Sequence, residues 1–247
     1  DILRFHAIYW PAFLLAANIE PPVKIFSHGW ILSGEEKMSK SKGNILNPLE
    51  IIDIYGIDET RYYLMKEVSH GSDGNISLKS LENCINSDLA NNYGNLCQRV
   101  FSFIKNNCAN NVEAYKDKLD SDQKIINETK NIIGELRNLM EEQNINSYIK
   151  SVINISFLTN KYINDEEPWK LKSSNVKRMN NILHLALEQI AKISILLNPI
   201  IPISTSKVLD ALNVKKSNRN LSFLDGENIL SEKISIAPLN ILFKKIT

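Results

Sequence analysis

The residues that organise this sequence read Lys-Met-Ser-Lys-Ser-Lys-Gly-Asn and occupy positions 37–44. They lie between an apolar segment that ends near Trp30 and a helix-like segment that begins at Pro48, which is typical of a loop joining two ordered elements. Ammonium groups, hydroxyls and a glycine so close together suit a polyphosphate anion. Ordinary solvated loops share this composition, so the order of the residues must decide between the two interpretations.

The order Lys-Met-Ser-Lys-Ser-x-Gly-Asn resembles the second signature of class I aminoacyl-tRNA synthetases. It is neither a P-loop, because it lacks Gly-x-x-x-x-Gly-Lys, nor a Gly-x-Gly-x-x-Gly dinucleotide turn. The flanking residues 1–6, 9–12 and 28–30 narrow the resemblance to methionyl-tRNA synthetase. The valine, isoleucine, leucine and cysteine enzymes match the loop but not these flanks, and one of them remains the nearest alternative.

The composition is that of an ordinary globular protein, with 247 residues of which 43% are hydrophobic, enough for one large domain or two smaller ones. Its 29 basic and 28 acidic residues nearly cancel, so any contact with RNA must be local. Cys84, Cys97 and Cys108 show no Cys-x-x-Cys spacing, which argues against a disulfide framework and a zinc knuckle. Without a signal-peptide pattern or a membrane-length apolar run, we expect a cytoplasmic protein that does not bind membranes.

The first third of the chain has mixed helix and strand character. Residues 1–17 predict a helix, kinked at Pro11 and apolar over most of its surface, and residues 23–29 predict the only convincing strand. Since one strand cannot cover such a helix, we expect the chain to begin inside a doubly wound α/β domain. Residues 48–55 and 58–68 predict two short helices, the first capped by Asn47 and ended by Gly56, and residues 71–75 predict a turn.

From Leu81 onward, apolar residues recur with the period of a helix, which predicts a helical bundle. The four stripes are Leu81, Ile85, Leu89, Tyr93, Leu96, Val100 and Ile104; Ile126, Thr129, Ile133, Leu136 and Met140; Ile145, Ile149, Val152, Ser156 and Ile163; and Val176, Met179, Leu183, Ala186, Ile190, Ile193 and Leu197. A shorter helix is expected over residues 204–212, and the last 35 residues have no assigned role. With the resemblance, the fold is expected to be mixed: residues 1–29 end a Rossmann-like nucleotide-binding domain, 30–92 form a small connecting (stem-contact) module, and 93–247 form an α-helical anticodon-binding domain.

The resemblance implies a methionine–tRNA ligase, which joins methionine to ATP as methionyl-adenylate and transfers the methionyl group to tRNA(Met). It implies that Lys37 and Lys40 are catalytic, because their charges would stabilise phosphate oxygens in the transition state. The positions that match ATP-binding residues are Asp1, His28, Gly29, Ile31, Lys37, Ser39 and Lys40, although a histidine that ends a strand is as often a packing residue. Ile2 and His6, four apart on one helix face, match the methionine pocket, whereas Tyr9, Trp10 and Phe13 are expected in the core.

A second group of residues points to RNA. Asn95 and Arg99 are four apart on the flank of an apolar stripe, and Trp169 could stack on an unpaired base. All three match anticodon-reading positions of the family. Taken singly, each residue also fits a purely structural role. Asn95 and Arg99 could be solvated side chains on the flank of a helix, and Trp169 could be a hydrophobic residue in the turn that starts a helix. Lys170, Lys172, Lys177 and Arg178 are candidate phosphate contacts, or else a solvated charged surface.

The resemblance also implies Mg²⁺ with the ATP and zinc in no part of this stretch. The oligomeric state is open, with a monomer slightly favoured. The resemblance places the other signature, His-x-Gly-His, upstream, so this stretch alone is expected to be inactive. Two functions from other classes remain open: a tRNA-binding module without catalysis, and a helical scaffold in which the lysine loop is a coincidence. An amino-acid-dependent pyrophosphate exchange assay distinguishes all of these.

Overall fold

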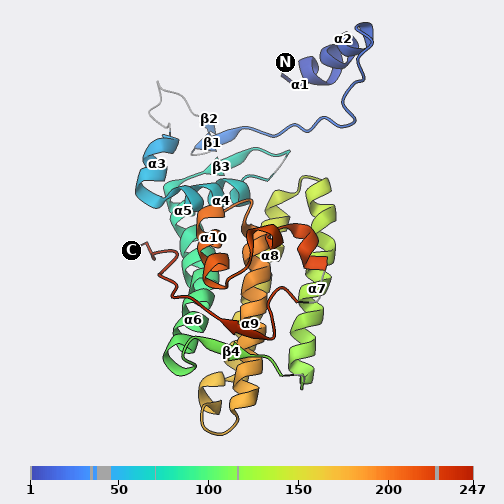
Figure 1. Cartoon of the computed structure of the whole chain (residues 1–247). Coiled ribbons are helices and arrows are strands. Elements are labelled where there is room, and N and C mark those ends of the chain that lie inside the picture. The colour runs from blue at the N-terminus through green and yellow to red at the C-terminus, as the bar shows by residue number, and fades with distance from the viewer. Residues whose placement is uncertain are drawn as a thin grey trace.

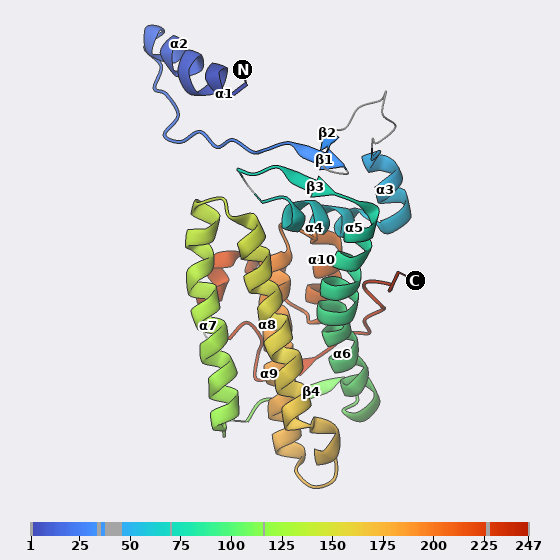
Figure 2. The same cartoon turned by 180° about the vertical axis from the view of Figure 1, so that it is seen from behind.

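The computed structural model describes residues 2–33, 36–37, 46–69, 71–115, 117–225 and 228–246. In these ranges a bundle of long helices carries a small three-stranded sheet at one end (Figure 1). The N-terminal helical segment lies apart from both, as the view from behind also shows (Figure 2). In the described part of the chain, none of the helices is long and apolar enough to cross a membrane.

The predicted N-terminal helix is present as three continuous segments, α1 (Ile2–Arg4), a π-helical turn (Phe5–Tyr9) and α2 (Trp10–Ala16). The widened turn precedes Pro11, whose ring does not fit against the preceding turn of a regular α-helix. No residue in the three segments is buried, because none of the described elements covers them. Tyr9, Trp10 and Phe13, predicted in the core, are 40%, 44% and 69% exposed in this chain, so that prediction is wrong here.

The predicted strand over residues 23–29 is also wrong, because this run has no regular secondary structure. Strand β1 (Ile31–Ser33) begins two residues later and pairs antiparallel with β2 (Glu36–Lys37) and parallel with β3 (Gly74–Ile76). Pairing starts where β3 supplies partners, and the Trp30 carbonyl already accepts from the Gly74 amide at 2.8 Å. Because β3 begins at Gly74, the turn predicted for residues 71–75 ends earlier than expected.

Both short helices after the lysine loop are confirmed, as α3 (Pro48–Tyr55) and α4 (Ile57–Glu67). The Asn47 side chain accepts from the Leu49 amide at 3.1 Å, and Pro48 occupies the first helical position, where its missing N–H costs nothing. Gly56 separates the two helices with φ +104°, a conformation that other residues rarely adopt. These local signals were sufficient to place the helices in the sequence.

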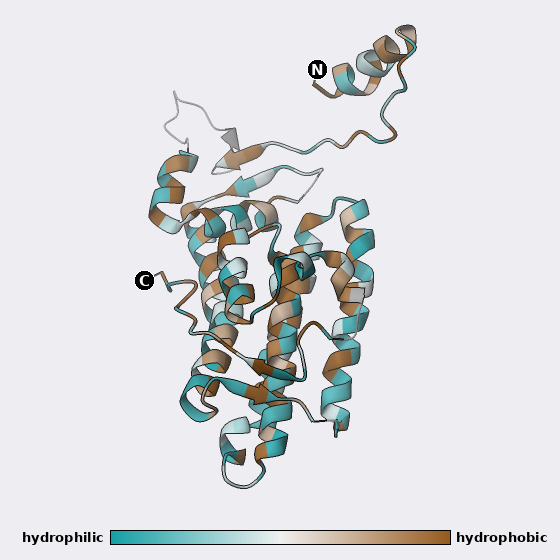
Figure 3. Cartoon of the chain, viewed as in Figure 1, coloured by the Kyte–Doolittle hydropathy of each residue, from teal (hydrophilic) through white to brown (hydrophobic). Residues whose placement is uncertain are grey.

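The bundle contains α5 (Leu78–Cys84), a π-helical stretch (Ile85–Gly94), α6 (Asn95–Asn107), α7 (Asp120–Glu141), α8 (Ile145–Glu166), α9 (Val176–Leu197) and α10 (Pro202–Ala211). Helix α9 is central, with most of its residues buried. Apolar strips on the helices face this core and polar strips face outward (Figure 3). The first, third and fourth predicted stripes are largely confirmed, although Val176 is half exposed.

The second stripe is only partly correct, since Met140 is 42% exposed and Ile126 is half-buried. The predicted members Thr129 and Leu136 are buried, and the buried row of α7 also includes Asp122 and Ile125, which the stripe did not contain. Thr129 donates to Gln189 of α9 at 2.9 Å, so a polar contact helps to set which face of α7 turns inward.

The described residues after α10 form a strap across the bundle. Strand β5 (Lys233–Ser235) pairs antiparallel with β4 (Asn111–Glu113), so the domain predicted as helical also contains a small sheet. Further along, the Phe243 ring packs 6.3 Å from that of Tyr93. This segment, to which the sequence assigned no role, therefore packs on the helices of the bundle.

Candidate functional site

The lysine motif begins on the β1–β2 hairpin at one end of the molecule. Leu32 pairs with Lys37, and Ser33 pairs with Glu36, so the motif begins on a strand, and the described residues resume at Leu46. Ser39 and Lys40, with the rest of residues 38–45, lie outside the described residues, as does the side chain of Lys37. The predicted catalytic roles of Lys37 and Lys40 therefore stay predictions.

The stretch at His28–Ile31 is built by a close backbone contact. A Cβ on Gly29 would lie 2.3 Å from the backbone of Ser72 and 2.5 Å from that of Asp73, so only glycine fits there. The Asp73 carboxylate accepts from the Trp30 amide at 2.6 Å, which holds the two segments together. This structural role of Gly29 was not apparent from the sequence, because its contact partner is distant along the chain. Its predicted role in ATP binding, with those of His28 and Ile31, is not tested by this contact.

His28 and Ile31 are both exposed, with the His28 Nδ1 3.0 Å from the Gly29 carbonyl oxygen. Ile2 and His6 are exposed on the N-terminal helix, where the His6 Nδ1 lies 2.9 Å from the Ile2 carbonyl oxygen. Asp1 lies outside the described residues. In this chain, the predicted methionine-pocket residues are thus on a segment that stands away from the sheet (Figure 1).

The three candidate RNA-reading residues lie on the bundle, and two of them meet. The Arg99 guanidinium of α6 lies over the Trp169 ring, 6.0 Å from its centroid, although the two are far apart in the sequence. Arg99 also donates to the side-chain oxygen of Asn164 on α8 at 2.8 Å. Asn95 is exposed one helical turn before Arg99, and Trp169 remains 38% exposed. We call Asn95, Arg99, Asn164 and Trp169 the Arg–Trp surface.

Asn164 is a member of this surface that the sequence did not predict. It fixes the guanidinium from a second helix, so Arg99 presents one face to Trp169 while the neighbouring Asn95 stays open to solvent. An aromatic face, a guanidinium plane and free amides are groups that hold and hydrogen-bond unpaired bases. The arrangement therefore presents groups of the kind that bind single-stranded nucleic acid.

An ion cluster behind the Arg–Trp surface fixes the loop that carries Trp169. Arg178, at the start of α9, donates to Asp122 of α7 at 2.5 and 2.8 Å and to Glu166, the last residue of α8, at 2.6 Å. The Tyr162 hydroxyl also donates to Asp122. Because Arg178 is 10% exposed and already bound, its predicted role as a phosphate contact is wrong.

Burial, hydrogen bonds and neighbouring charges together set the protonation states of Asp122 and Tyr162 in this ion cluster. Burial alone would raise the pKa of Asp122, but hydrogen bonds from Arg178 and Tyr162 outweigh it and hold that pKa below its ordinary value. Burial and the adjacent carboxylate raise the pKa of the Tyr162 hydroxyl. Asp122 is therefore ionised and Tyr162 neutral around pH 7, so the loop between α8 and α9 is tied down at both ends.

The other predicted phosphate contacts are on the surface. Lys170 pairs with Glu167 at 2.7 Å but stays 66% exposed. The ammonium groups of Lys172 and Lys177 lie 5.1 Å from the Phe103 ring centroid and 5.7 Å from that of Tyr115. Because these three lysines are exposed, their predicted role as phosphate contacts stays a prediction.

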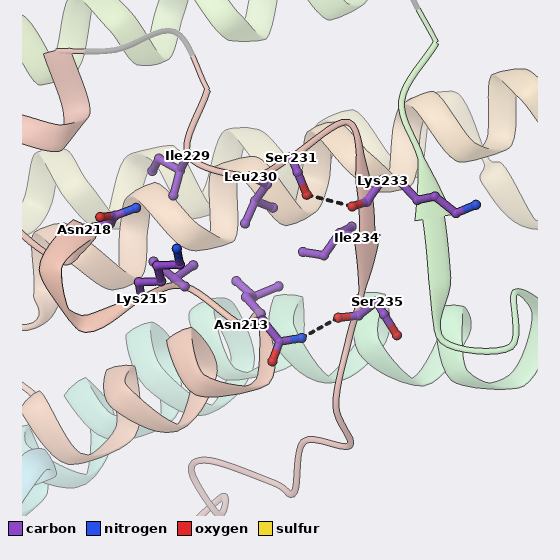
Figure 4. Close-up of a pocket in the computed structure, with 11 residues that line it drawn as sticks. Asn213, Lys215, Asn218, Ile229, Leu230, Ser231, Lys233, Ile234 and Ser235 are labelled. Carbon is purple, nitrogen blue, oxygen red and sulfur yellow. Dashed lines mark hydrogen bonds between the residues drawn. The ribbon is translucent and has the colours of Figure 1, made fainter.

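A cavity of about 340 Å³ lies where the turn after α10 meets β5 (Figure 4). Asn213 donates to the Ser235 carbonyl and Ser231 donates to the Lys233 carbonyl, each at 2.7 Å. The first bond joins the turn after α10 to β5, and the second lies within the C-terminal segment. The cavity is accordingly a structural junction, separate from the Arg–Trp surface.

Comparison with known proteins identifies both halves of the chain. Residues 1–101 match class I tRNA synthetases (M), and residues 112–247 match the anticodon binding domain of methionyl tRNA ligase. The methionine–tRNA ligase of Rickettsia typhi is 40% identical over the whole chain, and that of Rhizobium meliloti is 38% identical over 91% of it. The chain spans 49% and 43% of these two relatives, about half their length.

Solved structures agree with the sequence comparison. Methionyl-tRNA synthetase of Mycobacterium tuberculosis bound by methionyl-adenylate superposes with a TM-score of 0.92 at 33% identity, covering 99% of this chain and 48% of that one. The free form of the same enzyme gives a TM-score of 0.90 at 29% identity. The match includes the end of the catalytic domain and the helical bundle, as the resemblance predicted. The chain therefore belongs to the methionyl-tRNA synthetase family of class I tRNA synthetases.

Proposed function

We propose that the protein containing this chain is a methionine–tRNA ligase, which activates methionine with ATP and transfers it to tRNA(Met). The family supports this activity, and the relatives named above are methionine–tRNA ligases. The observation in this structure that carries the proposal is the Arg–Trp surface, in which Arg99 lies over Trp169 beside an open Asn95. Such a surface suits the unpaired bases of an anticodon.

In this proposal, residues 1–29 end the nucleotide-binding domain, 30–92 form the connecting module and 93–247 form the anticodon-binding domain. The lysine motif lies in the second of these and would hold the phosphates of ATP. When the methionine carboxylate attacks the α-phosphate, negative charge develops on the phosphate oxygens, and Lys37 and Lys40 would stabilise it. Ser39, His28, Gly29, Ile31 and Asp1 would complete the ATP site, and Ile2 and His6 the methionine pocket.

Among the described residues, no group of three or more His, Cys, Asp or Glu side chains could hold a metal ion. Mg²⁺ is proposed only as a companion of the ATP phosphates. A cytoplasmic monomer is likewise a proposal, which cell fractionation and light scattering of the full-length protein would test.

The direct test is amino-acid-dependent pyrophosphate exchange with the full-length protein. Methionine should support exchange, whereas isoleucine, valine, leucine and cysteine should not. Exchange with another of these amino acids would identify a different class I synthetase. Binding of tRNA without any exchange would identify a non-catalytic module, and binding of neither ATP nor tRNA would leave a helical scaffold.

A further inference from the structure

Helix α4 lies across the end of the bundle and covers the turn between α9 and α10 (Figure 2). Asp58, in the first turn of α4, is 3% exposed. Its carboxylate accepts from the Ser204 amide at 2.6 Å and lies 3.5 Å from the Ile203 amide. These amides belong to the first turn of α10, which has no side-chain cap of its own at Ile201. Asp58 therefore caps α10 from another part of the chain.

Arg61, one turn further along α4, binds the other side of the same turn. Its Nε donates to the Ile200 carbonyl and its second guanidinium nitrogen donates to the Pro199 carbonyl, each at 2.8 Å. These carbonyls follow the C-terminus of α9, where free acceptors favour a cation. Asp58 and Arg61 together satisfy the donors that begin α10 and the acceptors that follow α9. We call this pair the α4 clamp.

The other side of α4 holds the sheet on which the lysine motif begins. The Tyr63 hydroxyl accepts from the Ser77 amide at 3.0 Å, immediately after β3. Gly74, the first residue of β3, packs so closely on Val68 that a Cβ would lie 2.6 Å from its side chain. Since β3 pairs with β1 and β1 with β2, a series of ordered contacts runs from Lys37 to α4.

Helix α9 extends this series of contacts from the α4 clamp to the Arg–Trp surface. It has 22 residues, so its axis spans about 33 Å at 1.5 Å per residue. The α4 clamp holds the turn at its C-terminal end. At its N-terminal end, Arg178 ties α9 to Asp122 of α7 and to Glu166, which ends α8 just before the loop that carries Trp169. The largely buried helix α9 thus lies between the clamp and the Arg–Trp surface.

From these contacts we infer that Asp58 and Arg61 are positioning residues for aminoacylation, fixing the placement of the lysine motif relative to the Arg–Trp surface. The inference rests on the proposed function. A tRNA bound by its anticodon must deliver its far end to the nucleotide site. A change in the angle between α4 and α9 at the clamp would displace the Arg–Trp surface, which lies at the other end of α9, relative to the lysine motif. Activation of methionine needs no tRNA and should be insensitive to that angle.

The test compares two reactions of the full-length protein. In Arg61→Met, the kcat of tRNA charging should fall about tenfold or more, while the KM for tRNA changes less than threefold and methionine-dependent exchange less than twofold. Asp58→Ala should behave in the same way. Arg61→Lys and Asp58→Asn keep a donor and an acceptor in place, so they should recover most of the charging rate.

Matched controls are Arg137→Met on the exposed face of α7 and Asp53→Ala on the exposed face of α3, which should change neither reaction. The inference is overturned if exchange falls in parallel with charging, if the loss is entirely in the KM for tRNA, if the conservative variants lose as much as the others, or if charging is unchanged. Failure of the proposed function has a different signature, since the unmodified protein would then show no methionine-dependent exchange.

Discussion

The substitution Arg178→Met tests the ion cluster behind the Arg–Trp surface most directly. Arg178 is the cation that both Asp122 and Glu166 contact, and the side chains of these carboxylates are only 3% and 20% exposed. Removing one partner of a buried ion pair typically costs about 3–5 kcal/mol, because the remaining charge is left in a poorly solvated position. For a cooperative unit of the size of the bundle, that loss corresponds to about 6–20 °C in Tm.

The lowered pKa of Asp122 predicts how the stability loss in Arg178→Met changes with pH. The pKa of Asp122 lies below its ordinary value in the folded protein, so its contribution to the free energy of unfolding is present above about pH 4 and is lost as the pH falls through the lowered folded pKa. In Arg178→Met, burial instead raises that pKa, and the ionised carboxylate opposes folding at neutral pH. The difference between variant and unmodified protein should therefore be largest near pH 7 and should shrink below about pH 4.

Calorimetry of the full-length protein at several pH values measures this difference. Adding Asp122→Asn to Arg178→Met should restore much of the loss, because it removes the buried charge and leaves Glu166 partly accessible to water. Arg137→Met on the exposed face of α7 is the matched control, expected within about 0.5 kcal/mol of the unmodified protein. The reasoning is refuted if Arg178→Met is as mild as the control, or if its deficit is independent of pH.

Four further substitutions test the proposed sites in the full-length protein. Lys40→Ala should lower the rate of methionine-dependent exchange by about 10²–10³ with little change in methionine binding, since its charge is needed in the transition state; an unchanged rate would remove its catalytic assignment. Trp169→Ala and Arg99→Ala should each weaken tRNA charging by about 1–3 kcal/mol and spare exchange, whereas equal losses in both assays would indicate misfolding. Gly29→Ala should lower the Tm, because its Cβ would meet the Ser72 backbone at 2.3 Å; an unchanged Tm would show that the contact can relax.

The local elements could be predicted because their signals lie within a few residues of one another. Asn47, Pro48 and Gly56 bound α3 through a cap, a fixed φ and a positive φ, each independent of the rest of the fold. The stripes of α6, α8 and α9 were also readable, since a side chain three or four residues away shares the same helix face. The strand predicted over residues 23–29 failed because strand propensity does not specify a partner, and β3 is available only from Trp30 onward.

The family, the order of a catalytic-domain part before a helical bundle, and the candidate residues could be read from local patterns, namely the lysine motif, its flanks and the helical periods. The three-dimensional packing was needed to show that Arg178 is a buried tie instead of a phosphate contact, that Asn164 holds Arg99 over Trp169, and that α4 clamps the turn after α9. The physical reason is that these contacts join residues far apart in the chain. Their partners are selected by the packing of whole helices, which the spacing of neighbouring residues does not encode.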